Sequence, residues 1–358
     1  MQDEYVLEML GISKSFPGVK ALDGVSLRVR PGEVHALMGE NGAGKSTLMK
    51  ILDGVYRPDS GTIRLHGNDV EIAGPQDAIR KGIAMIHQEL SAVPSMTIAE
   101  NIFLGREIKK HGFVDTKGML EQSRSLLQHL GFDFDPSARM STLSIAGCQM
   151  IEIAKAVSCD ADVIIMDEPS SAITENEVTK LFHIIRDVTA KGVAVIYITH
   201  KMDEVFQIAD TVTVIRDGCY IDSRPVGEFT QETLVNMLVG RELKDVYPKE
   251  PVPVGEVLLE VRGLCRKGMY QDVSFSLCRG EILGVAGLVG AGRSEVFESV
   301  AGITKPDSGE ILMKGEPKHF RYPGDAIRNR IVIATEDRKK TGLFLDLPIR
   351  DNMMAECY

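Results

Sequence analysis

The strongest constraint on the fold of this 358-residue chain is an internal repeat. Five short strings recur without a gap at a constant spacing, with Gly39 recurring as Gly287, 248 residues later. The matched pairs begin at Val25 and Val273, Gly32 and Gly280, Gly39 and Gly287, Pro58 and Pro306, and Asp77 and Asp325. Such a repeat predicts two copies of one folding unit.

The two copies differ in extent. Between them lies RELKDVYPKEPVPVGE, residues 241–256, a proline-rich and charged segment that is typical of a linker. We predict a first domain over residues 1–240 and the N-terminal part of a second domain over residues 257–358. Because the second copy covers only the opening part of the unit, we expect it to leave sheet edges and apolar surface without partners. A truncated or partial gene product is one hypothesis for this difference.

Composition is that of an ordinary cytoplasmic protein. Apolar residues make up 44% of the chain and charged residues 26%, as in soluble globular proteins. The net charge of −10 argues against a nucleic-acid-binding surface, which needs clustered positive charge. Six scattered cysteines without a CxxC pair indicate neither a disulfide framework nor a zinc site. The N-terminus lacks the pattern of a signal peptide, and the longest apolar runs are only as long as strands.

A glycine-rich loop in the first copy predicts a phosphate site. The string VHALMGENGAGKSTLMKIL contains a short apolar strand, the pattern Gly-x4-Gly-Lys-Ser and a helical pattern, in that order. Glycines let backbone N–H groups converge on phosphate oxygens, and the helix N-terminus adds partial positive charge. We expect Lys45 to reach the β- and γ-phosphates of ATP and the Ser46 hydroxyl to bind Mg²⁺. The alternative is a glycine-rich turn before a buried helix. The predicted ATP-binding loop consists of Gly39, Glu40, Asn41, Gly42, Ala43, Gly44, Lys45, Ser46 and Thr47.

An acidic pair follows a predicted buried strand over residues 163–166. Asp167 and Glu168 would then lie at the carboxyl end of the strand, the edge where open α/β sheets bind ligands. We expect Asp167 to hold Mg²⁺ through water and Glu168 to act as the general base that polarises the attacking water. Alone, such a pair is equally well explained as a helix cap, but the phosphate loop favours catalysis.

Two further polar side chains are expected at this edge. The strand in VAVIYITHKMDEV ends at Thr199 and His200, which places His200 where a side chain can meet a γ-phosphate. Gln88 follows a strand predicted over residues 83–86, where an amide can contact both Mg²⁺ and the attacking water. Taken alone, His200 is more often a structural histidine, and Gln88 is equally well a polar strand end.

In their order and spacing these motifs closely resemble those of the ABC-type ATPases: GENGAGKST, the glutamine after AMIH, LSIAGCQMIEIAKAV, IIMDEPSSAIT and YITHKMDEV. The duplication, GLVGAGRSE and TEDRKKTGL narrow the resemblance to the fused double ATPase subunits of ribose- and galactose/methyl-galactoside-type sugar importers. The resemblance covers the whole chain. It implies an α/β P-loop NTPase fold, duplicated with an incomplete second copy, and a helical subdomain over about residues 89–157 of the first copy.

The resemblance also implies roles for individual residues. Phe16 resembles the aromatic residue that stacks on adenine, although a core phenylalanine fits the sequence as well. Residues 171–174 resemble the loop that contacts the partner domain, and Gln88 resembles the hinge toward the membrane permease.

The signature motif departs from the family pattern. In this family each ATP lies between the phosphate loop of one domain and the LSGGQ signature of the other, whereas this chain has LSIAG, with Ser144, Ala146 and Gly147. We expect this half-site to be weak if the backbone at Ala146 needs a positive φ or a close approach to phosphate, because a methyl group is costly there.

The second phosphate loop also departs from the pattern. It keeps Gly287, Gly290, Gly292 and Ser294, but Arg293 stands where the first copy has Lys45. Arginine is a larger planar group that cannot occupy the space of lysine inside the loop. At the position of Gln88, the second copy has Glu336. We therefore predict one hydrolytic site and one degenerate, non-hydrolytic site, and leave open whether the second binds nucleotide.

The resemblance implies an ATP hydrolase that couples Mg-ATP hydrolysis to uptake of a monosaccharide, as a peripheral protein on the cytoplasmic face of the inner membrane. Its partners would be integral-membrane permease subunits and, through them, an extracytoplasmic sugar-binding protein. The alternative is a truncated, non-hydrolytic regulatory or inactive ATP-binding subunit, because the second-copy counterparts of Ser144 and Asp167 would lie beyond residue 358. An ATPase acting on nucleic acid is disfavoured by the acidic balance. Self-association and the identity of the sugar stay open.

Overall fold

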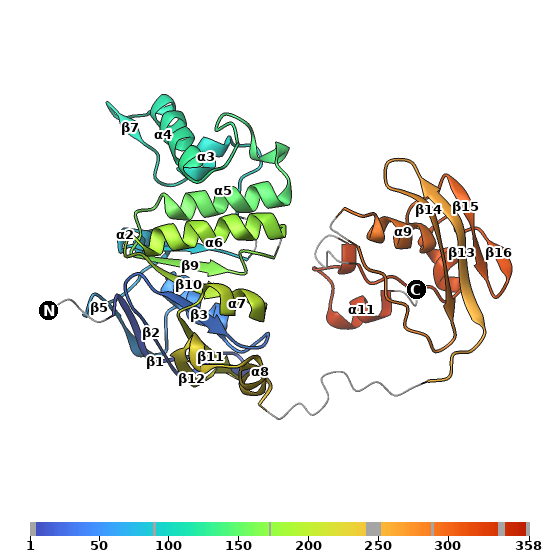
Figure 1. Ribbon diagram of the computed structural model, residues 1–358, viewed down its shortest axis with the longest axis horizontal. Coiled ribbons are helices and arrows are strands. Elements are labelled where there is room, and N and C mark those ends of the chain that lie inside the picture. The colour runs from blue at the N-terminus through green and yellow to red at the C-terminus, as the bar shows by residue number, and fades with distance from the viewer. Residues whose placement is uncertain are drawn as a thin grey trace. The chain divides into compact units, whose positions relative to one another are not determined.

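The chain divides into two compact units, Met1–Val246 and Tyr247–Tyr358, which are described separately below (Figure 1). The computed structural model describes residues 5–88, 91–171, 173–240, 252–287, 290–335 and 341–355. Most of the predicted linker lies outside these residues, and the predicted domain bounds stay a prediction.

A six-stranded sheet forms the centre of the first unit, in the order β12-β11-β3-β10-β9-β6. Its strands are β3 (Val34–Met38), β6 (Ile83–Ile86), β9 (Val163–Asp167), β10 (Ala194–Ile198), β11 (Thr211–Arg216) and β12 (Cys219–Pro225). All neighbours are parallel except β12, which pairs antiparallel with β11. Every residue of β3, β9 and β10 is buried, which explains why these strands are mostly apolar, with His35 in β3 and Asp167 at the end of β9 as the polar exceptions. The strands predicted over residues 83–86 and 163–166 are confirmed.

A second, antiparallel sheet covers one side of helix α1 (Lys45–Leu52). It has the order β2-β1-β4-β5, and its strands are β1 (Leu7–Phe16), β2 (Val19–Val29), β4 (Ser60–Leu65) and β5 (Asn68–Val70). Leu48, Met49, Ile51 and Leu52 of α1 are buried in one core with residues of both sheets. The phosphate-loop helix is therefore fixed from two sides.

Helices make up much of the remainder of the first unit. They are α2 (Pro75–Arg80), α3 (Ile98–Ile102), α4 (Thr116–His129), α5 (Ile145–Val157), α6 (Glu175–Thr189), α7 (Met202–Ile208) and α8 (Gln231–Val239), with short 3-10 helices at Met140–Thr142 and Val226–Glu228. Between α3 and α4 lies a hairpin of β7 (Lys109–Lys110) and β8 (Phe113–Val114). In Figure 1, α5 and α6 lie next to the parallel sheet, while α3, α4 and β7 lie farther from it. Helices α3, α4 and α5 lie within the bounds of the predicted helical subdomain, which stays a prediction; residues 89 and 90 lie outside the described residues.

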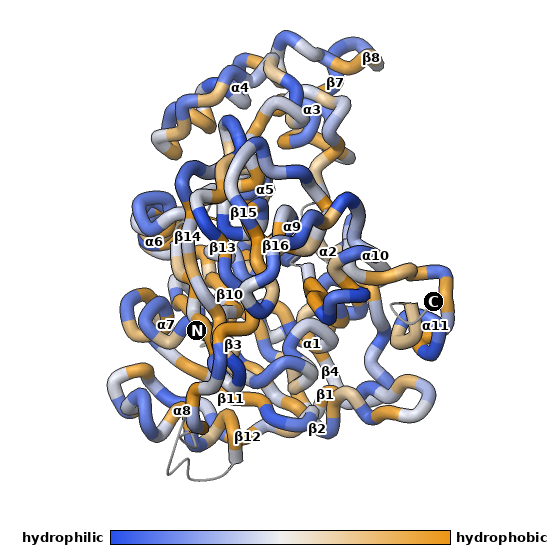
Figure 2. Tube along the Cα trace, turned by 90° about the vertical axis from the view of Figure 1, so that its right-hand side faces the viewer, coloured by the Kyte–Doolittle hydropathy of each residue, from blue (hydrophilic) through white to orange (hydrophobic). Residues whose placement is uncertain are grey.

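Helix α4 is amphipathic. Met119, Ser123 and Leu127 are buried at a spacing of four residues, and Figure 2 shows hydrophilic and hydrophobic residues alternating along this helix. Within the described parts of the chain, no helix is both apolar and long enough to span a membrane.

The second unit repeats the antiparallel sheet of the first, in the equivalent order β14-β13-β15-β16. Its elements are β13 (Val257–Arg266), β14 (Tyr270–Cys278), α9 (Arg293–Val300), β15 (Ser308–Met313), β16 (Glu316–Lys318), α10 (Pro323–Arg328) and α11 (Ile349–Met354). The repeat in the sequence is therefore also a repeat in the structure.

Residues 282–286, the counterpart of β3, do not form a strand in the second unit. In the first unit β3 lies between β10 and β11, and the described residues of the second unit contain no equivalents of these two strands. Ile282 is consequently 93% exposed. Val332 stands at the position of Ala84 in β6, which pairs with β9 in the first unit, and the described residues of the second unit contain no equivalent of β9, so Val332 is 58% exposed. The expected exposure of apolar side chains is confirmed for these residues.

Candidate functional site

Close backbone packing shapes the loop between β3 and α1. Gly42 and Gly44 have φ angles of 88° and 101°, in the left-handed region that favours glycine. A Cβ at Gly39 would lie 2.4 Å from the carbonyl oxygen of Ile215, and a Cβ at Gly44 would lie 2.6 Å from that of Ala21. Gly39 and Gly44 must therefore be glycine because β11 and β2 leave no room for a side chain there, whether or not a phosphate is bound.

The ammonium group of Lys45 lies inside this loop. Its Nζ donates to the carbonyl oxygens of Gly39 at 2.6 Å and Glu40 at 3.0 Å. Burial lowers the pKa of Lys45, although the nearby charges of Asp167 and Glu168 oppose this shift. These two hydrogen bonds hold the ammonium group inside the loop.

The loop borders a cavity of about 570 Å³, a volume typical of small-molecule sites. The predicted site residues that line it are Phe16, Asn41, Gly42, Gly44, Lys45, Ser46, Thr47, Gln88, Asp167 and Glu168. Gly39, Glu40 and Ala43 belong to the loop but not to the cavity lining, and His200 reaches the site through Glu168. Predicted residues as far apart in the sequence as Phe16 and Glu168, which are separated by 152 positions, thus meet at one cavity.

Glu168 lies between two of the other predicted side chains. Gln88 Nε2 donates to Glu168 Oε2 at 3.0 Å, and His200 Nδ1 lies 3.1 Å from Glu168 Oε1. The backbone φ of Glu168 is 48°, which is uncommon for a residue other than glycine, and its N–H donates to the carbonyl of Ile198 at 2.9 Å. The three side chains follow the neighbouring strands β6, β9 and β10, so the order of the strands brings them together.

Asp167 provides a buried carboxylate beside the loop. It is 7% exposed, and burial together with the negative charge of Glu168 raises its pKa, while the charge of Lys45 acts in the opposite direction. Among the residues that the structure describes, no group of three His, Cys, Asp or Glu could hold a metal ion. Mg²⁺, however, is usually bound by one or two carboxylates together with substrate phosphates. The oxygen donors of Ser46, Asp167 and Gln88 around one cavity fit an ion of that kind.

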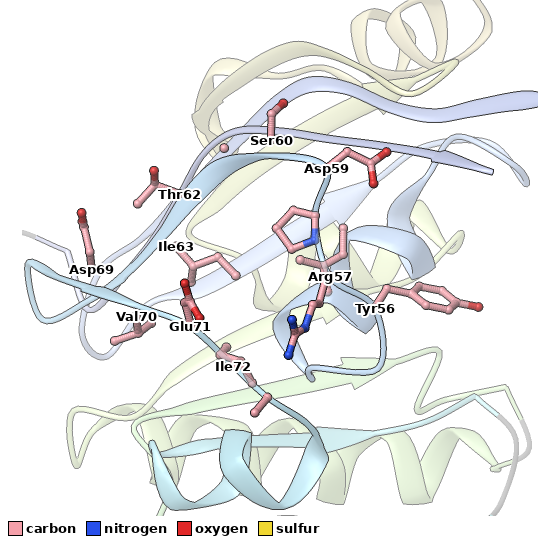
Figure 3. A pocket seen from close by; sticks show the side chains of 14 residues that line it. Tyr56, Arg57, Asp59, Ser60, Thr62, Ile63, Asp69, Val70, Glu71 and Ile72 are labelled. Carbon is pink, nitrogen blue, oxygen red and sulfur yellow. The ribbon is translucent and has the colours of Figure 1, made fainter.

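Phe16 is half-buried at the end of β1 and packs edge-on against Tyr56, with ring centroids 5.2 Å apart. Tyr56 also lines a second cavity, of about 580 Å³, bordered mainly by β4, β5 and the segments next to them (Figure 3). None of the described residues that line this second cavity is a predicted site residue. Phe16 therefore lines the first cavity and packs against Tyr56, which lines the second.

The signature segment forms the start of α5. Ser144 is the N-cap residue, and its Oγ accepts a hydrogen bond from the N–H of Gly147 at 3.1 Å. Ala146 lies in the first helical turn and does not have a positive φ. The first condition for a costly methyl group at Ala146, a positive φ, is therefore not met, because the residue lies in helical geometry, which suits alanine better than glycine. The effect of its methyl group on a phosphate stays a prediction.

The described residues of the second phosphate loop repeat two features of the first loop but not its lysine contacts. Gly290 and Gly292 have φ angles of 80° and 83°, and α9 begins at Arg293 as α1 begins at Lys45. Within the described residues, Arg293 makes no hydrogen bond or ion pair. It lines a largely apolar cavity of about 820 Å³ with Ser294. Residues 288, 289 and 336, which include the predicted Glu336, lie outside the described residues.

Phe16 has no counterpart in the second unit. Ser13 pairs with Ser60 as Cys265 pairs with Ser308, so these two positions are equivalent. From Ser13 the chain takes 12 residues to reach Val25, whereas from Cys265 it takes 8 to reach the matching Val273. The segment that carries Phe16 is shorter by four residues in the second unit.

Sequence reasoning missed two parts of the cavity lining: residues 19–21 of β2, and Asp217 and Gly218 in the β11–β12 turn. The N–H of Gly218 donates to the carbonyl of Ala43 at 3.1 Å, and its carbonyl accepts from the N–H of Asp23 at 2.7 Å. The Asp-Gly dipeptide predicts a hairpin turn. It does not indicate that the turn contacts the phosphate loop.

Comparison with known proteins gives consistent matches. The family model described as ABC transporter matches residues 22–171 and 270–356. A relative from Geobacillus kaustophilus, named as a ribose/galactose/methyl galactoside import ATP-binding protein, is 56% identical over 357 residues, which cover 99% of this chain and 71% of the relative. A relative from Burkholderia lata, named in the same way, is 53% identical over 98% of this chain and 67% of its own length.

Two solved structures resemble the chain. One is the ADP conformation of an ATP-binding cassette of an ABC transporter, which is 26% identical with a TM-score of 0.58 over 66% of this chain and 99% of that one. The other is a nucleotide-free ATP-binding cassette from an ABC transporter, 25% identical with a TM-score of 0.57 over 69% of this chain and 100% of that one. The predicted fold class is thereby confirmed.

Proposed function

Because this chain belongs to the ABC transporter family, we propose that it is the ATP-binding subunit of an importer for a monosaccharide of the ribose, galactose or methyl galactoside type. The relatives that carry this name align with 98–99% of the chain. The main structural support for the proposal is that one cavity is lined by Lys45, Asp167, Glu168 and Gln88.

Each of these residues has a role that follows from its position. The loop amides and Lys45 bind the phosphates, and Phe16 stacks on the base. Ser46, Asp167 and Gln88 would hold Mg²⁺, which supplies positive charge to the transferred phosphoryl group when bound.

Glu168 orients the attacking water and accepts its proton. Its two carboxylate oxygens are already fixed by Gln88 and His200, at 3.0 and 3.1 Å, so the general base is preorganised. His200 lies next to the place where negative charge develops on the γ-phosphate. Catalysis by one such base is typically worth about 10²–10⁴ in rate.

The two nucleotide sites are unequal in this proposal. Lys45 donates to two carbonyl oxygens of its loop, whereas Arg293 makes no hydrogen bond among the described residues, and the second unit has no equivalent of Phe16. We assign hydrolysis to the first loop and at most nucleotide binding to the second. ATP turnover measured after Lys45→Ala and after Arg293→Ala tests this difference, and equal losses would refute it.

The chain acts as a peripheral protein on the cytoplasmic face of the inner membrane, bound to permease subunits that receive sugar from an extracytoplasmic binding protein. Reconstitution with the permease subunits in lipid tests this directly. We expect ATP hydrolysis that rises in the presence of the permease and is abolished by Lys45→Ala. Nucleotide binding without any turnover would instead support a non-hydrolytic regulatory subunit.

A further inference from the structure

A buried carboxylate outside the nucleotide cavity connects two of the loops that form the site. Glu204, in α7, is 7% exposed. Its Oε2 accepts hydrogen bonds from Ser170 Oγ and Tyr197 Oη, both at 2.8 Å, and from Thr199 Oγ1 at 3.3 Å. Its Oε1 lies 3.0 Å from the ammonium of Lys201.

Two of these donors adjoin predicted catalytic side chains. Ser170 is two residues beyond Glu168 in the segment after β9, and Thr199 directly precedes His200 after β10. Both donors are buried. One carboxylate therefore ties together the segments that carry Glu168 and His200.

Lys201 strengthens the same connection. Its Nζ donates to the carbonyl oxygen of Ser170 at 3.1 Å and lies 3.2 Å from Ser170 Oγ. Its backbone N–H donates to Thr199 Oγ1 at 3.0 Å. Lys201 thus pairs with Glu204 and also contacts both the segment after β9 and the segment after β10.

A carboxylate suits this position because it accepts several hydrogen bonds and donates none. A neutral amide of the same shape would have only one accepting oxygen. With that oxygen in the place of Oε2, the NH₂ group would face the ammonium group of Lys201, and the ion pair would be lost. With the amide turned the other way, the three hydroxyl groups would lose their acceptor, which is costly.

The segment after β9 needs such support. Glu168 has a positive φ, and a backbone conformation of this kind persists only where the surrounding structure enforces it. The Glu168–His200 contact of 3.1 Å depends on where both segments lie.

We propose that Glu204 is a positioning residue for ATP hydrolysis, which holds Ser170 and Thr199 together and so keeps Glu168 against His200. This inference rests on the proposed function. Glu204 lies outside the nucleotide cavity and acts through the two segments that it connects.

The first test measures the two segments without relying on catalysis. Glu204→Gln in the full chain is expected to increase amide hydrogen exchange in residues 168–171 and in residues 199–202, while residues 39–47 keep their protection. The matched control is Glu33→Gln. Glu33 is another buried carboxylate of the first unit, bonded to the N–H of Arg30 at 2.7 Å and located before β3, away from the phosphate loop. Unchanged exchange in either segment, or the same pattern in the control, would overturn the proposal.

The second test concerns turnover. Glu204→Gln is expected to lower kcat by up to about 100-fold, because a small displacement of Glu168 from His200 misplaces the catalytic groups. The KM for ATP should change little. In a His200→Ala background the same substitution should have a much smaller effect, because the contact it supports is already lost. Equal losses in the two backgrounds would refute positioning through His200.

The two tests separate this inference from the proposed function. A wild-type chain that binds nucleotide but fails to hydrolyse it with its permease would contradict the proposed function. The exchange measurement would still decide whether Glu204 holds the two segments together.

Discussion

Replacing Gly44 by alanine is expected to destabilise the first unit more than replacing Gly42, although both residues have left-handed backbones, with φ of 101° and 88°. Each substitution carries a backbone cost of about 1–2 kcal/mol. Only at Gly44 would the new Cβ meet other atoms, at 2.6 Å from the Ala21 carbonyl oxygen and 2.7 Å from Leu22 Cδ2, whereas nothing lies within 4 Å at Gly42. Overpacking of this kind adds about 1–3 kcal/mol. The free energies of unfolding of the two variants should therefore differ by about 1–3 kcal/mol.

Urea denaturation of the full chain, followed by circular dichroism, measures this difference. Leu48→Ala in the core of α1 identifies the transition of the first unit, because this substitution should cost about 2–5 kcal/mol there. With a slope of about 2 kcal/mol per molar urea, the midpoints of Gly42→Ala and Gly44→Ala should differ by roughly 0.5–1.5 M. Equal midpoints, or a lower midpoint for Gly42→Ala, would refute the argument that the loop is packed tightly against β2.

Glu168→Gln should lower the rate of phosphate release by about 10²–10⁴ while binding of a fluorescent ATP analogue is retained, and parallel losses of both would contradict its role as a general base. Phe16→Ala should weaken binding of the same analogue by about 5- to 100-fold if the ring stacks on the base, and an unchanged Kd would assign Phe16 to packing alone. Burial raises the pKa of Glu204, but hydrogen bonds from Ser170, Tyr197 and Lys201 outweigh it, so the folded-state pKa lies below the ordinary value of 4.5. This stabilisation is present above pH 4.5 and is lost as the pH falls through the folded-state pKa, so the melting temperature of Glu204→Gln should depend less on pH below 4.5 than that of the wild type; identical slopes would be inconsistent with this reasoning.

Much of the first unit could be predicted because its strands are buried in a parallel sheet. Continuous apolar runs over residues 83–86 and 163–166 correspond to β6 and β9, since a strand covered on both faces needs no polar alternation. The contacts of Glu168 with Gln88 and His200 agree with the edge at which these residues were expected. Their roles in catalysis stay predictions.

Other features could not be predicted because they depend on contacts between distant segments. The hydrogen bond between Gly218 and Ala43 joins the β11–β12 turn to the phosphate loop. The carboxylate of Glu204 likewise accepts hydrogen bonds from two segments, the one after β9 and the one that contains the end of β10. The ordinary helical backbone at Ala146 depends on where α5 begins, which the departure from the family motif did not indicate.

The sequence by itself determined the duplication and the composition of the phosphate loop, because both are properties of residue order alone. It also determined the buried strands, because a continuous apolar run acts within one segment. Only the tertiary structure decided that the β11–β12 turn borders the nucleotide cavity, with the buried N–H of Gly218 donating to the carbonyl of Ala43. A buried backbone N–H must find an acceptor, but which distant carbonyl it meets is set by the fold and cannot be inferred from the Asp-Gly dipeptide.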